Sequence, residues 1–464
     1  MEPVSCSLHS FLTEYAARCP ERRLLGDPGG WMTAHQVLKA VEEKAGKLRH
    51  LGIGRGGMTA LRAYRRLDTA ITILALQTLG AVAVLTDPRH EIGEFLSGSG
   101  IPISAIIDGE RIEVLSPASD WEAPDPQDPG FIIFTSGSTG KPKAVMLSQY
   151  NLVNNLLDSQ PLGDYRADDI ALGILPMDHV FGLVLLAGIC VLGYGLYLPE
   201  GKDIPAILGA IESQRITRMN GVPGLYMAMA EAAGGYDLSS LRAGFIGGGP
   251  WTPEQFVWME ERLGMTLIPV YGMSEFVGIA CADFWESRQE RAQGGAPFYS
   301  MNRGKILLPD GGEAAPGQVG EICVDGPARM VGYFGDNTLR EAFLHTGDLG
   351  YLDEAGCLRL TGRKKDIIIR NGVNLSPRRI EDAILAIPGV TEAAVVGLPD
   401  QRAGELPWAM VACDRVIDFV AELAGRLHKN EIPVGFYFVE ALQKTPSGKP
   451  DRQTIREVLE KWKA

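Results

Sequence analysis

Short apolar runs alternate with amphipathic segments along much of the chain, a pattern that predicts strands alternating with helices. The clearest unit has an apolar run at Ala243–Ile246, an amphipathic segment, and a second apolar run at residues 266–271. The amphipathic segment carries helix signals, because Thr252 and Gln255 form a capping box and Gly264 follows the last turn. Strand, helix, strand predicts a parallel pair with a right-handed crossover, and ligands bind such sheets at the carboxyl ends of the strands.

A long uncharged stretch at residues 180–198 imitates a membrane span, since its 19 residues approach the length of about 20 that crosses a bilayer. It contains four glycines, however, and lacks Lys or Arg at either end to anchor it. A core helix running into a buried strand is the better interpretation.

The pattern changes after about residue 351. Residues 358–372 predict a strand, a basic turn and a second strand; a helix at 378–386, a strand at 393–397, a helix at 416–429 and a basic loop at 444–452 follow. We therefore expect an α/β protein. Residues 1–364 should form a large domain of mixed or parallel sheets flanked by helices, and 365–464 a small α+β domain.

Composition and charge narrow the class of protein. The chain is 45% hydrophobic, 22% charged and has a formal net charge of -13 without a long basic run, which argues against nucleic-acid binding. The seven cysteines are scattered without a Cys-x-x-Cys pair, so we expect a reducing compartment rather than a disulfide framework or a zinc site. The first residues lack a basic segment followed by an apolar core, so no secretory signal is predicted and the cytoplasm is the expected location.

Residues 131–148, FIIFTSGSTGKPKAVMLS, predict a strand that ends in a phosphate-binding loop. Glycines let backbone N–H groups approach a ligand closely, while hydroxyls and lysines supply donors and charge. The loop is not a Walker A motif, which needs Gly where Thr135 stands and Ser or Thr where Pro142 stands. The alternative is a flexible surface turn, but a segment this rich in Gly, Ser, Thr and Lys directly after an apolar strand favours a phosphate-binding loop. The expected ligands to phosphate are Thr135, Ser136, Gly137, Ser138, Thr139, Gly140, Lys141 and Lys143.

Other motifs are weak when taken singly. In YGMSE, Tyr271 could stack on an adenine ring, Ser274 could touch a phosphate and Glu275 could hold Mg²⁺. In HTGDLG, Asp348 should lie in a tight turn, where it could accept both ribose hydroxyls or bond only its own backbone. In PMDHVFG, His179 stands beside aromatic and apolar residues and is either part of a pocket wall or a core residue.

Together, in this order, these motifs resemble those of the adenylate-forming superfamily, which includes acyl- and aryl-CoA synthetases, adenylation domains of peptide synthetases and luciferases. The resemblance covers nearly the whole chain, and TSGSTGKPK with HTGDLG and GRKKD is highly specific. It implies that a carboxylate attacks the α-phosphorus of Mg-ATP to give an acyl-adenylate and pyrophosphate, after which a thiol displaces AMP. Lys449, in the basic loop KTPSGKPDR, matches the catalytic lysine of the family.

The resemblance also assigns roles by position. Catalytic roles fall to Lys449, His179, Ser274 and Glu275, with Glu275 as the metal ligand. Adenine should lie between Tyr271 and the turn Gly248, Gly249 and Pro250, next to Gly272 and Met273, and ribose on Asp348 and Arg363. Lys365 matches a hinge about which the small domain swings, and the loop at Gly372 matches one that reaches the pantetheine tunnel.

Four positions depart from the family pattern. Ala144 replaces a glycine, Gln149 a histidine, Ser274 the commoner threonine, and Arg379 a frequent glutamate. None removes a group that the first half-reaction needs, although Arg379 leaves the contacts of the second domain orientation open.

The substrate and the acceptor are less well defined. Amino-acid-selective relatives usually carry an aspartate soon after the position of His179, but here apolar residues follow, and a buried ammonium without a partner would be costly. We therefore expect an uncharged aryl or aliphatic acid, with ATP and coenzyme A as cosubstrates and Mg²⁺ as a cofactor. The alternatives are a freestanding enzyme that loads the phosphopantetheine of a separate carrier protein, and a nucleotide-binding protein without activity. The oligomeric state stays open.

Overall fold

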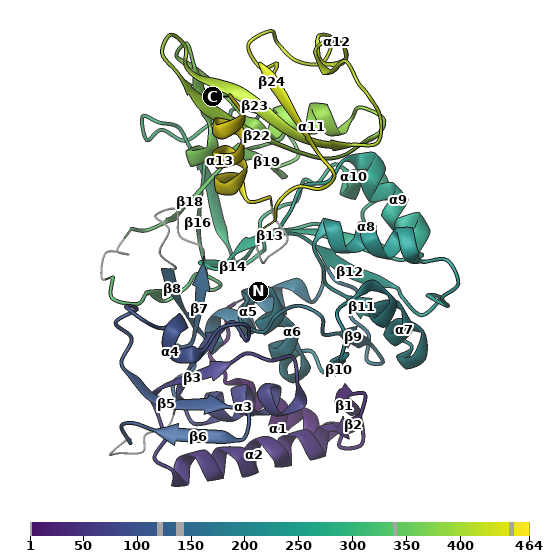
Figure 1. Ribbon diagram of the computed structural model, residues 1–464. Helices are drawn as coiled ribbons and strands as arrows, with labels where there is room; N and C mark the ends of the chain where they lie inside the picture. The colour runs from purple at the N-terminus through teal and green to yellow at the C-terminus, as the bar shows by residue number, and fades with distance from the viewer. Residues whose placement is uncertain (1, 118–123, 136–142, 337–340, 445–449, 464) are drawn as a thin grey trace.

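The computed structural model describes residues 2–117, 124–135, 143–336, 341–444 and 450–463. Its first large sheet is mostly parallel, with antiparallel strands at its two edges (Figure 1). The strand order is β14 (Phe276–Cys281), β13 (Thr266–Met273), β12 (Ala243–Ile246), β11 (Arg218–Met219), β9 (Ile170–Leu172), β10 (Gly195–Tyr197), β1 (Arg23–Asp27) and β2 (Gly30–Thr33).

The second large sheet is parallel at its centre and carries the strands on both sides of the predicted phosphate loop. Its order is β17 (Gly332–Tyr333), β8 (Lys143–Ser148), β7 (Pro129–Thr135), β4 (Val82–Thr86), β3 (Met58–Arg62), β5 (Ile103–Asp108) and β6 (Arg111–Val114).

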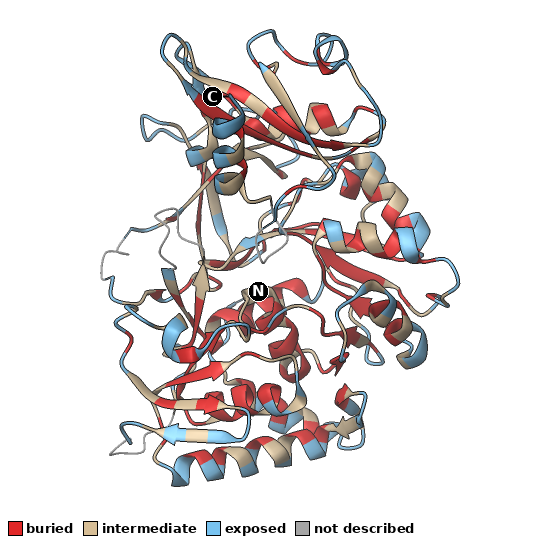
Figure 2. Ribbon diagram, in the orientation of Figure 1, coloured by how far each residue is buried: buried red, intermediate tan, exposed pale blue. Residues whose placement is uncertain are grey.

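Helices cover both faces of these sheets. Helices α5 and α6 are mostly buried, because they lie in a core that also contains side chains of both large sheets (Figure 2). A second core packs α7, α8 and α9 on the first sheet. The helices of this part are α1 (Leu8–Arg18), α2 (Ala34–His50), α3 (Leu67–Thr78), α4 (Ile92–Phe95), α5 (Gln149–Ser159), α6 (Val180–Val191), α7 (Ile204–Gln214), α8 (Pro223–Ala232), α9 (Pro253–Leu263) and α10 (Arg288–Ala292).

Two smaller sheets follow along the chain. An antiparallel sheet has the order β15 (Arg303–Leu307), β16 (Gly320–Asp325), β18 (Leu344–Leu352) and β19 (Leu358–Arg363). After the short helix η1 (Lys364–Asp366), the C-terminal part groups at the top of Figure 1 and has its own cores. Its elements are β20 (Ile368–Arg370), β21 (Val373–Leu375), α11 (Pro377–Leu385), β22 (Val390–Asp400), β23 (Gly404–Cys413), α12 (Phe419–Leu423), β24 (Gly435–Val439) and α13 (Arg452–Lys463).

The strand–helix–strand unit predicted from the sequence is confirmed. Helix α9 begins at Pro253; the Thr252 hydroxyl accepts the Gln255 N–H at 3.2 Å and the Gln255 side chain accepts the Thr252 N–H at 2.9 Å. Gly264 ends the helix with φ of +66°, a conformation that glycine adopts without steric cost. Strands β12 and β13 are parallel, as expected.

The apolar stretch at 180–198 is also confirmed as a core helix followed by a buried strand, α6 and β10. Among the described residues, no helix combines the length and the apolar character needed to cross a bilayer.

The predicted helix at 416–429 is wrong in its length, because α12 contains only Phe419–Leu423. The Asp418 carboxylate accepts the Ala421 N–H and starts the helix after Val416, whose side chain is fully exposed. Gly425 then follows, a residue that weakens helices, and the chain continues in turns. Only the short segment that buries Phe419 and Leu423 remains helical.

Two departures from the family pattern have structural explanations. Gln149 is buried at the start of α5, where its Oε1 accepts the Leu8 N–H at 2.8 Å and its Nε2 donates to the Gln77 carbonyl at 3.1 Å. Gln149 thus joins the N-terminal helix α1 to the core.

Arg379 on α11 forms an ion pair with Glu431 at 2.7 Å, so its charge is paired inside the C-terminal part.

We expect Gln149→Leu to lower the free energy of unfolding by about 1–3 kcal/mol, because the buried Leu8 N–H would lose its acceptor. Urea denaturation checks this: the midpoint should fall, while the slope of the unfolding free energy against urea concentration should stay unchanged. Gln160→Leu is the control, since Gln160 is exposed just beyond the same helix. Equal midpoint shifts in the two variants would contradict this role for Gln149.

Candidate active site

Residues predicted to bind adenine lie where β12 and β13 end. Gly247 is buried and a Cβ there would meet the Val270 carbonyl at 2.6 Å, so only glycine allows this approach. Gly248 follows with φ of +78°, and the turn through Gly249 and Pro250 leads into α9. The prediction of a glycine turn at this edge is confirmed, whereas its contact with adenine stays a prediction.

The YGMSE segment is only partly a loop. Tyr271, Gly272 and Met273 belong to β13 itself, and Ser274 and Glu275 form the turn to β14. The strand extends further than expected because β13 and β14 pair as a hairpin. A Cβ on Gly272 would lie 2.5 Å from the Val277 carbonyl, so this glycine permits the close pairing.

The expectation that Asp348 lies in a tight turn is wrong, because the residue is inside β18. Gly347, with φ of +72°, precedes it near an irregularity in the pairing of β18 with β19, and Arg363 on β19 lies opposite Asp348. Asp348 is 7% exposed. The antiparallel pair therefore fixes the carboxylate more firmly than a turn would.

Asp348 joins two of the other predicted site residues. Its Oδ2 accepts a hydrogen bond from the Tyr271 hydroxyl at 2.7 Å, and its Oδ1 lies 3.0 Å from Arg363 Nε. Burial, and then the Asp348 carboxylate, raise the pKa of Tyr271 well above its usual value, so the hydroxyl stays protonated and donates. The structure thus brings together Tyr271, Asp348 and Arg363 from three strands.

Glu275 has a partner that the sequence did not suggest. The Tyr333 hydroxyl donates to Glu275 Oε1 at 2.7 Å, and the face of the Tyr333 ring lies 4.7 Å from Lys143 Nζ. The motif MVGYF contains Tyr333, but nothing in its spacing reveals a partner 58 residues earlier in the chain. Only the antiparallel pairing of β17 with β8 places Tyr333 beside the end of the phosphate loop.

The donor set at Glu275 fits a magnesium ion. Among the described residues, the side-chain partner of the Glu275 carboxylate is the neutral Tyr333 hydroxyl. Mg²⁺ prefers oxygen ligands and is usually held by one or two carboxylates together with substrate phosphates. No group of three or more potential metal ligands occurs in the described part of the chain, and the role of Glu275 as a metal ligand stays a prediction.

The phosphate loop is described only at its two ends. Thr135 ends β7 and Lys143 begins β8, and the two residues pair across the hairpin. Residues 136–142, which include Ser136, Gly137, Ser138, Thr139, Gly140 and Lys141, lie outside the described residues, as does Lys449. The loop therefore connects two antiparallel strands, and its predicted contacts with phosphate stay predictions.

His179 lies at the N-cap of α6 and is half-buried. Gly182 allows the preceding turn to pack on the helix, since a Cβ there would clash with the Pro176 carbonyl. The neighbouring Asp178 keeps a buried Oδ1 without a partner among the described residues. Burial raises the pKa of Asp178, the charges of His179 and Arg89 oppose this rise, and that of Asp87 adds to it.

The predicted hinge and thiol-tunnel loop are both exposed. Lys365 lies in η1, and Gly372 lies in the turn between β20 and β21 with φ of +77° beside Asn371 at +52°. Two successive left-handed residues make the tight hairpin turn for which Asn-Gly is favoured. The Asn371–Gly372 turn is thus exposed to solvent at the end of the β20–β21 hairpin.

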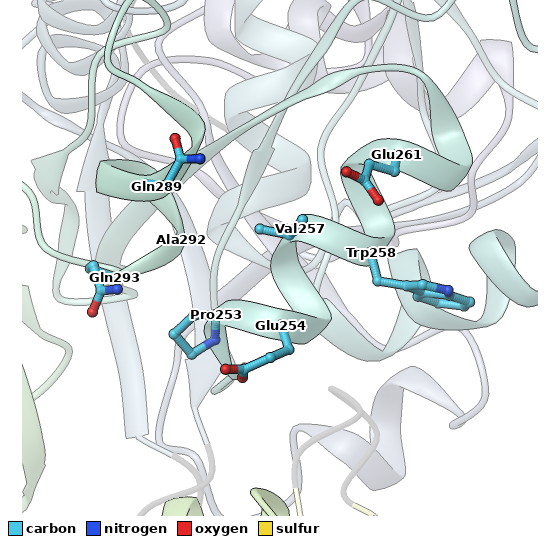
Figure 3. A pocket seen from close by; sticks show the side chains of 8 residues that line it. All are labelled: Pro253, Glu254, Val257, Trp258, Glu261, Gln289, Ala292 and Gln293. Carbon is cyan, nitrogen blue, oxygen red and sulfur yellow. The ribbon is translucent and has the colours of Figure 1, made fainter.

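A shallow surface cavity of about 380 Å³ lies between α9 and α10 (Figure 3). It is lined by Pro253, Glu254, Val257, Trp258, Glu261, Gln289, Ala292 and Gln293. None of these eight residues belongs to the predicted ATP site, so the cavity is separate from the residues around Asp348 and Glu275.

Comparison with known proteins agrees with this arrangement. The family described as "AMP-binding enzyme" matches residues 12–97 and 101–334, and "AMP-binding enzyme C-terminal domain" matches 379–449. The 2-succinylbenzoate–CoA ligase of Bacillus cereus (strain Q1) is 30% identical over 98% of this chain and 99% of its own.

Two solved structures are similar over nearly their whole length. The o-succinylbenzoate CoA synthetase of Bacillus subtilis, in complex with its acyl-adenylate intermediate, has a TM-score of 0.84 at 25% identity and covers 98% of both chains. The amide bond synthetase McbA of Marinactinospora thermotolerans has a TM-score of 0.84 at 25% identity, covering 97% of this chain and 99% of its own. The predicted α/β fold, with a large N-terminal and a small C-terminal part, is confirmed. This chain therefore belongs to the AMP-binding enzyme family, the adenylate-forming enzymes, and is an AMP-forming acid–thiol ligase.

Proposed function

We propose that the chain activates a carboxylic acid with Mg-ATP, forms an acyl-adenylate and pyrophosphate, and transfers the acyl group to the thiol of coenzyme A with release of AMP. The observation that carries this proposal is the group formed by Tyr271, Asp348 and Arg363, at the end of the strand that pairs with β12, from which the Gly248 turn leaves. A buried carboxylate between a phenol and a guanidinium is suited to accept the two hydroxyls of a ribose. A cytoplasmic location, where ATP and reduced thiols are present, fits the reaction.

Negative charge increases around the α-phosphate when the carboxylate attacks, and the residues proposed for this step answer that need. Lys449 would place an ammonium at the bridging oxygen, and Lys143 would lie beside the departing phosphates. Magnesium, held by Glu275 and the phosphates, would withdraw charge from the reacting phosphoryl group. His179 and Ser274 would border the acid and a phosphate.

We propose the hinge at Lys365 and the domain boundary between residues 364 and 365. On one side, Lys364 Nζ donates to Glu321 in β16 at 2.9 Å; on the other, Asp366 lies 3.5 Å from Arg452 of α13. Lys365 between them is exposed and pairs with no acid among the described residues. Lys364 is thus bonded to the large N-terminal part and Asp366 to the small C-terminal part. This supports Lys365, which lies between them, as the residue about which the small domain rotates.

This rotation would take Lys449 away after the first step and bring the Gly372 turn to the incoming thiol. One cavity would then serve two reactions in turn, as a mobile domain permits.

For the acid, we infer an aryl or aliphatic carboxylate without an amino group. Helix α6 contains no acidic residue after His179, so this segment offers no carboxylate to pair with a substrate ammonium. Relatives named 2-succinylbenzoate–CoA ligase make 2-succinylbenzoate the first compound to test.

Pyrophosphate release should therefore be at least about tenfold faster with the best aryl or aliphatic acid than with any α-amino acid, since burying an unpaired ammonium costs more than about 1.4 kcal/mol. The panel should include 2-succinylbenzoate, simple benzoates, short and medium fatty acids, and amino acids. Preference for an amino acid would contradict this inference and would direct attention to Asp178.

The acceptor is tested separately. We expect thioester to form with coenzyme A; the alternative, loading of a carrier-protein phosphopantetheine, predicts thioester only on added holo-carrier protein. No thioester with coenzyme A, at normal adenylate formation, would favour the carrier-protein alternative.

A further inference from the structure

The segment 328–334 connects the two halves of the predicted ATP site. On one side, Val331 N donates to the Met146 carbonyl and Phe334 N to the Ala144 carbonyl, both at 2.9 Å, which fixes it to β8. On the other side, Met330 N donates to the Glu275 carbonyl at 3.0 Å. The strand that leaves the phosphate loop is thereby held at a fixed distance from the β13–β14 turn.

Tyr333 is the side chain of this segment that reaches both halves. Its hydroxyl donates to Glu275 Oε1 at 2.7 Å while Lys143 Nζ lies 4.7 Å from the ring centroid. The hydroxyl is the donor of this pair, because an ionised carboxylate can only accept a hydrogen bond.

Each contact restricts a flexible charged side chain. A glutamate that accepts on one carboxylate oxygen is held in a single orientation and keeps the other oxygen open to a cation. A lysine ammonium over the face of a tyrosine ring gains a weaker cation–π attraction, which favours the few lysine rotamers that keep it there. Tyr333 therefore sets the position of the Glu275 carboxylate relative to the Lys143 ammonium.

We propose that Tyr333 is a positioning residue for Mg-ATP: its hydroxyl orients the Glu275 carboxylate towards the metal, and its ring holds Lys143 beside the phosphates. The proposal rests on the proposed function, because the role of Glu275 as metal ligand is part of it. Tyr333 would act through its contacts with Glu275 and Lys143 rather than by touching the metal or the substrate.

Mn²⁺ binding to the full-length enzyme with ATP, and without acid, tests the proposal without turnover. Electron paramagnetic resonance measures free Mn²⁺, and the decrease beyond that in the same Mn²⁺–ATP mixture without enzyme reports the metal held by the enzyme. Tyr333→Phe should weaken Mn²⁺ binding about tenfold, as expected for one lost hydrogen bond to a charged group. Tyr333→Leu, which also removes the ring, should in addition weaken ATP binding a few-fold. Tyr15→Phe is the matched control, since its hydroxyl also donates at 2.7 Å, to the Gly193 carbonyl.

A double-mutant cycle with Glu275→Gln separates positioning from a structural role. If Tyr333 acts through Glu275, Tyr333→Phe should have no further effect on Mn²⁺ binding in an enzyme that already carries Glu275→Gln. Equal losses in both backgrounds, or unchanged Mn²⁺ binding in Tyr333→Phe, would overturn the proposal while leaving the metal role of Glu275 intact. Unchanged Mn²⁺ binding in Glu275→Gln would overturn both.

Discussion

Lys449→Ala is expected to slow acyl-adenylate formation by roughly 100- to 1,000-fold while changing thioester formation from supplied acyl-adenylate only a few-fold. The first step builds charge around the α-phosphate, and a lost cation there raises its barrier. In the second step the small domain would have turned, so Lys449 would be away from the reacting atoms. Pyrophosphate release measures the first step, and AMP release from synthetic acyl-adenylate and coenzyme A measures the second.

Lys444→Ala is the matched control for this experiment. Lys444 starts the same basic loop, but its ammonium pairs with Glu392 of β22 and is therefore engaged inside the small domain. We expect both half-reactions to stay near wild-type rates in this variant. Similar losses in both half-reactions of Lys449→Ala would contradict domain rotation and would place the lysine in a site shared by both steps.

Local sequence signals predicted the frame of the site well. The capping box at Thr252 and Gln255, with Gly264 at the end, defined α9 because these contacts lie within a few residues of each other. The apolar runs on either side of α9 predicted β12 and β13, which pair in parallel. They therefore also predicted the sheet edge at which these strands end and at which Gly248 and the Tyr271 segment lie. Periodicity and capping suffice where an element is specified by its own residues.

Contacts between distant segments could not be predicted in this way. Asp348 lies in a strand because β19 pairs with it, and the Tyr333–Glu275 contact depends on β17 pairing with β8. Gln149 looked like an unexplained departure because its partner Leu8 is 141 residues away. In each case the deciding interaction joins residues that only the folded chain brings together.

Asp348→Ala is expected to lower kcat/KM for ATP roughly 100-fold, the other large effect that the site predicts. The variant removes the acceptor proposed for the ribose hydroxyls, and it leaves the Tyr271 hydroxyl and the Arg363 guanidinium without their shared carboxylate. Pyrophosphate release at saturating acid, together with ATP binding by calorimetry, would show whether the loss lies in nucleotide binding.

The matched control is Asp353→Ala, because the Asp353 carboxylate likewise pairs with an arginine, Arg359, at 2.9 Å. It lies in the turn between β18 and β19 and accepts backbone N–H groups there, away from Tyr271 and Arg363. Losing Asp353 should therefore lower stability without changing ATP affinity. If both variants bind ATP as the wild type does, Asp348 serves only to join β13, β18 and β19; if only Asp348→Ala loses affinity, the buried carboxylate binds the nucleotide.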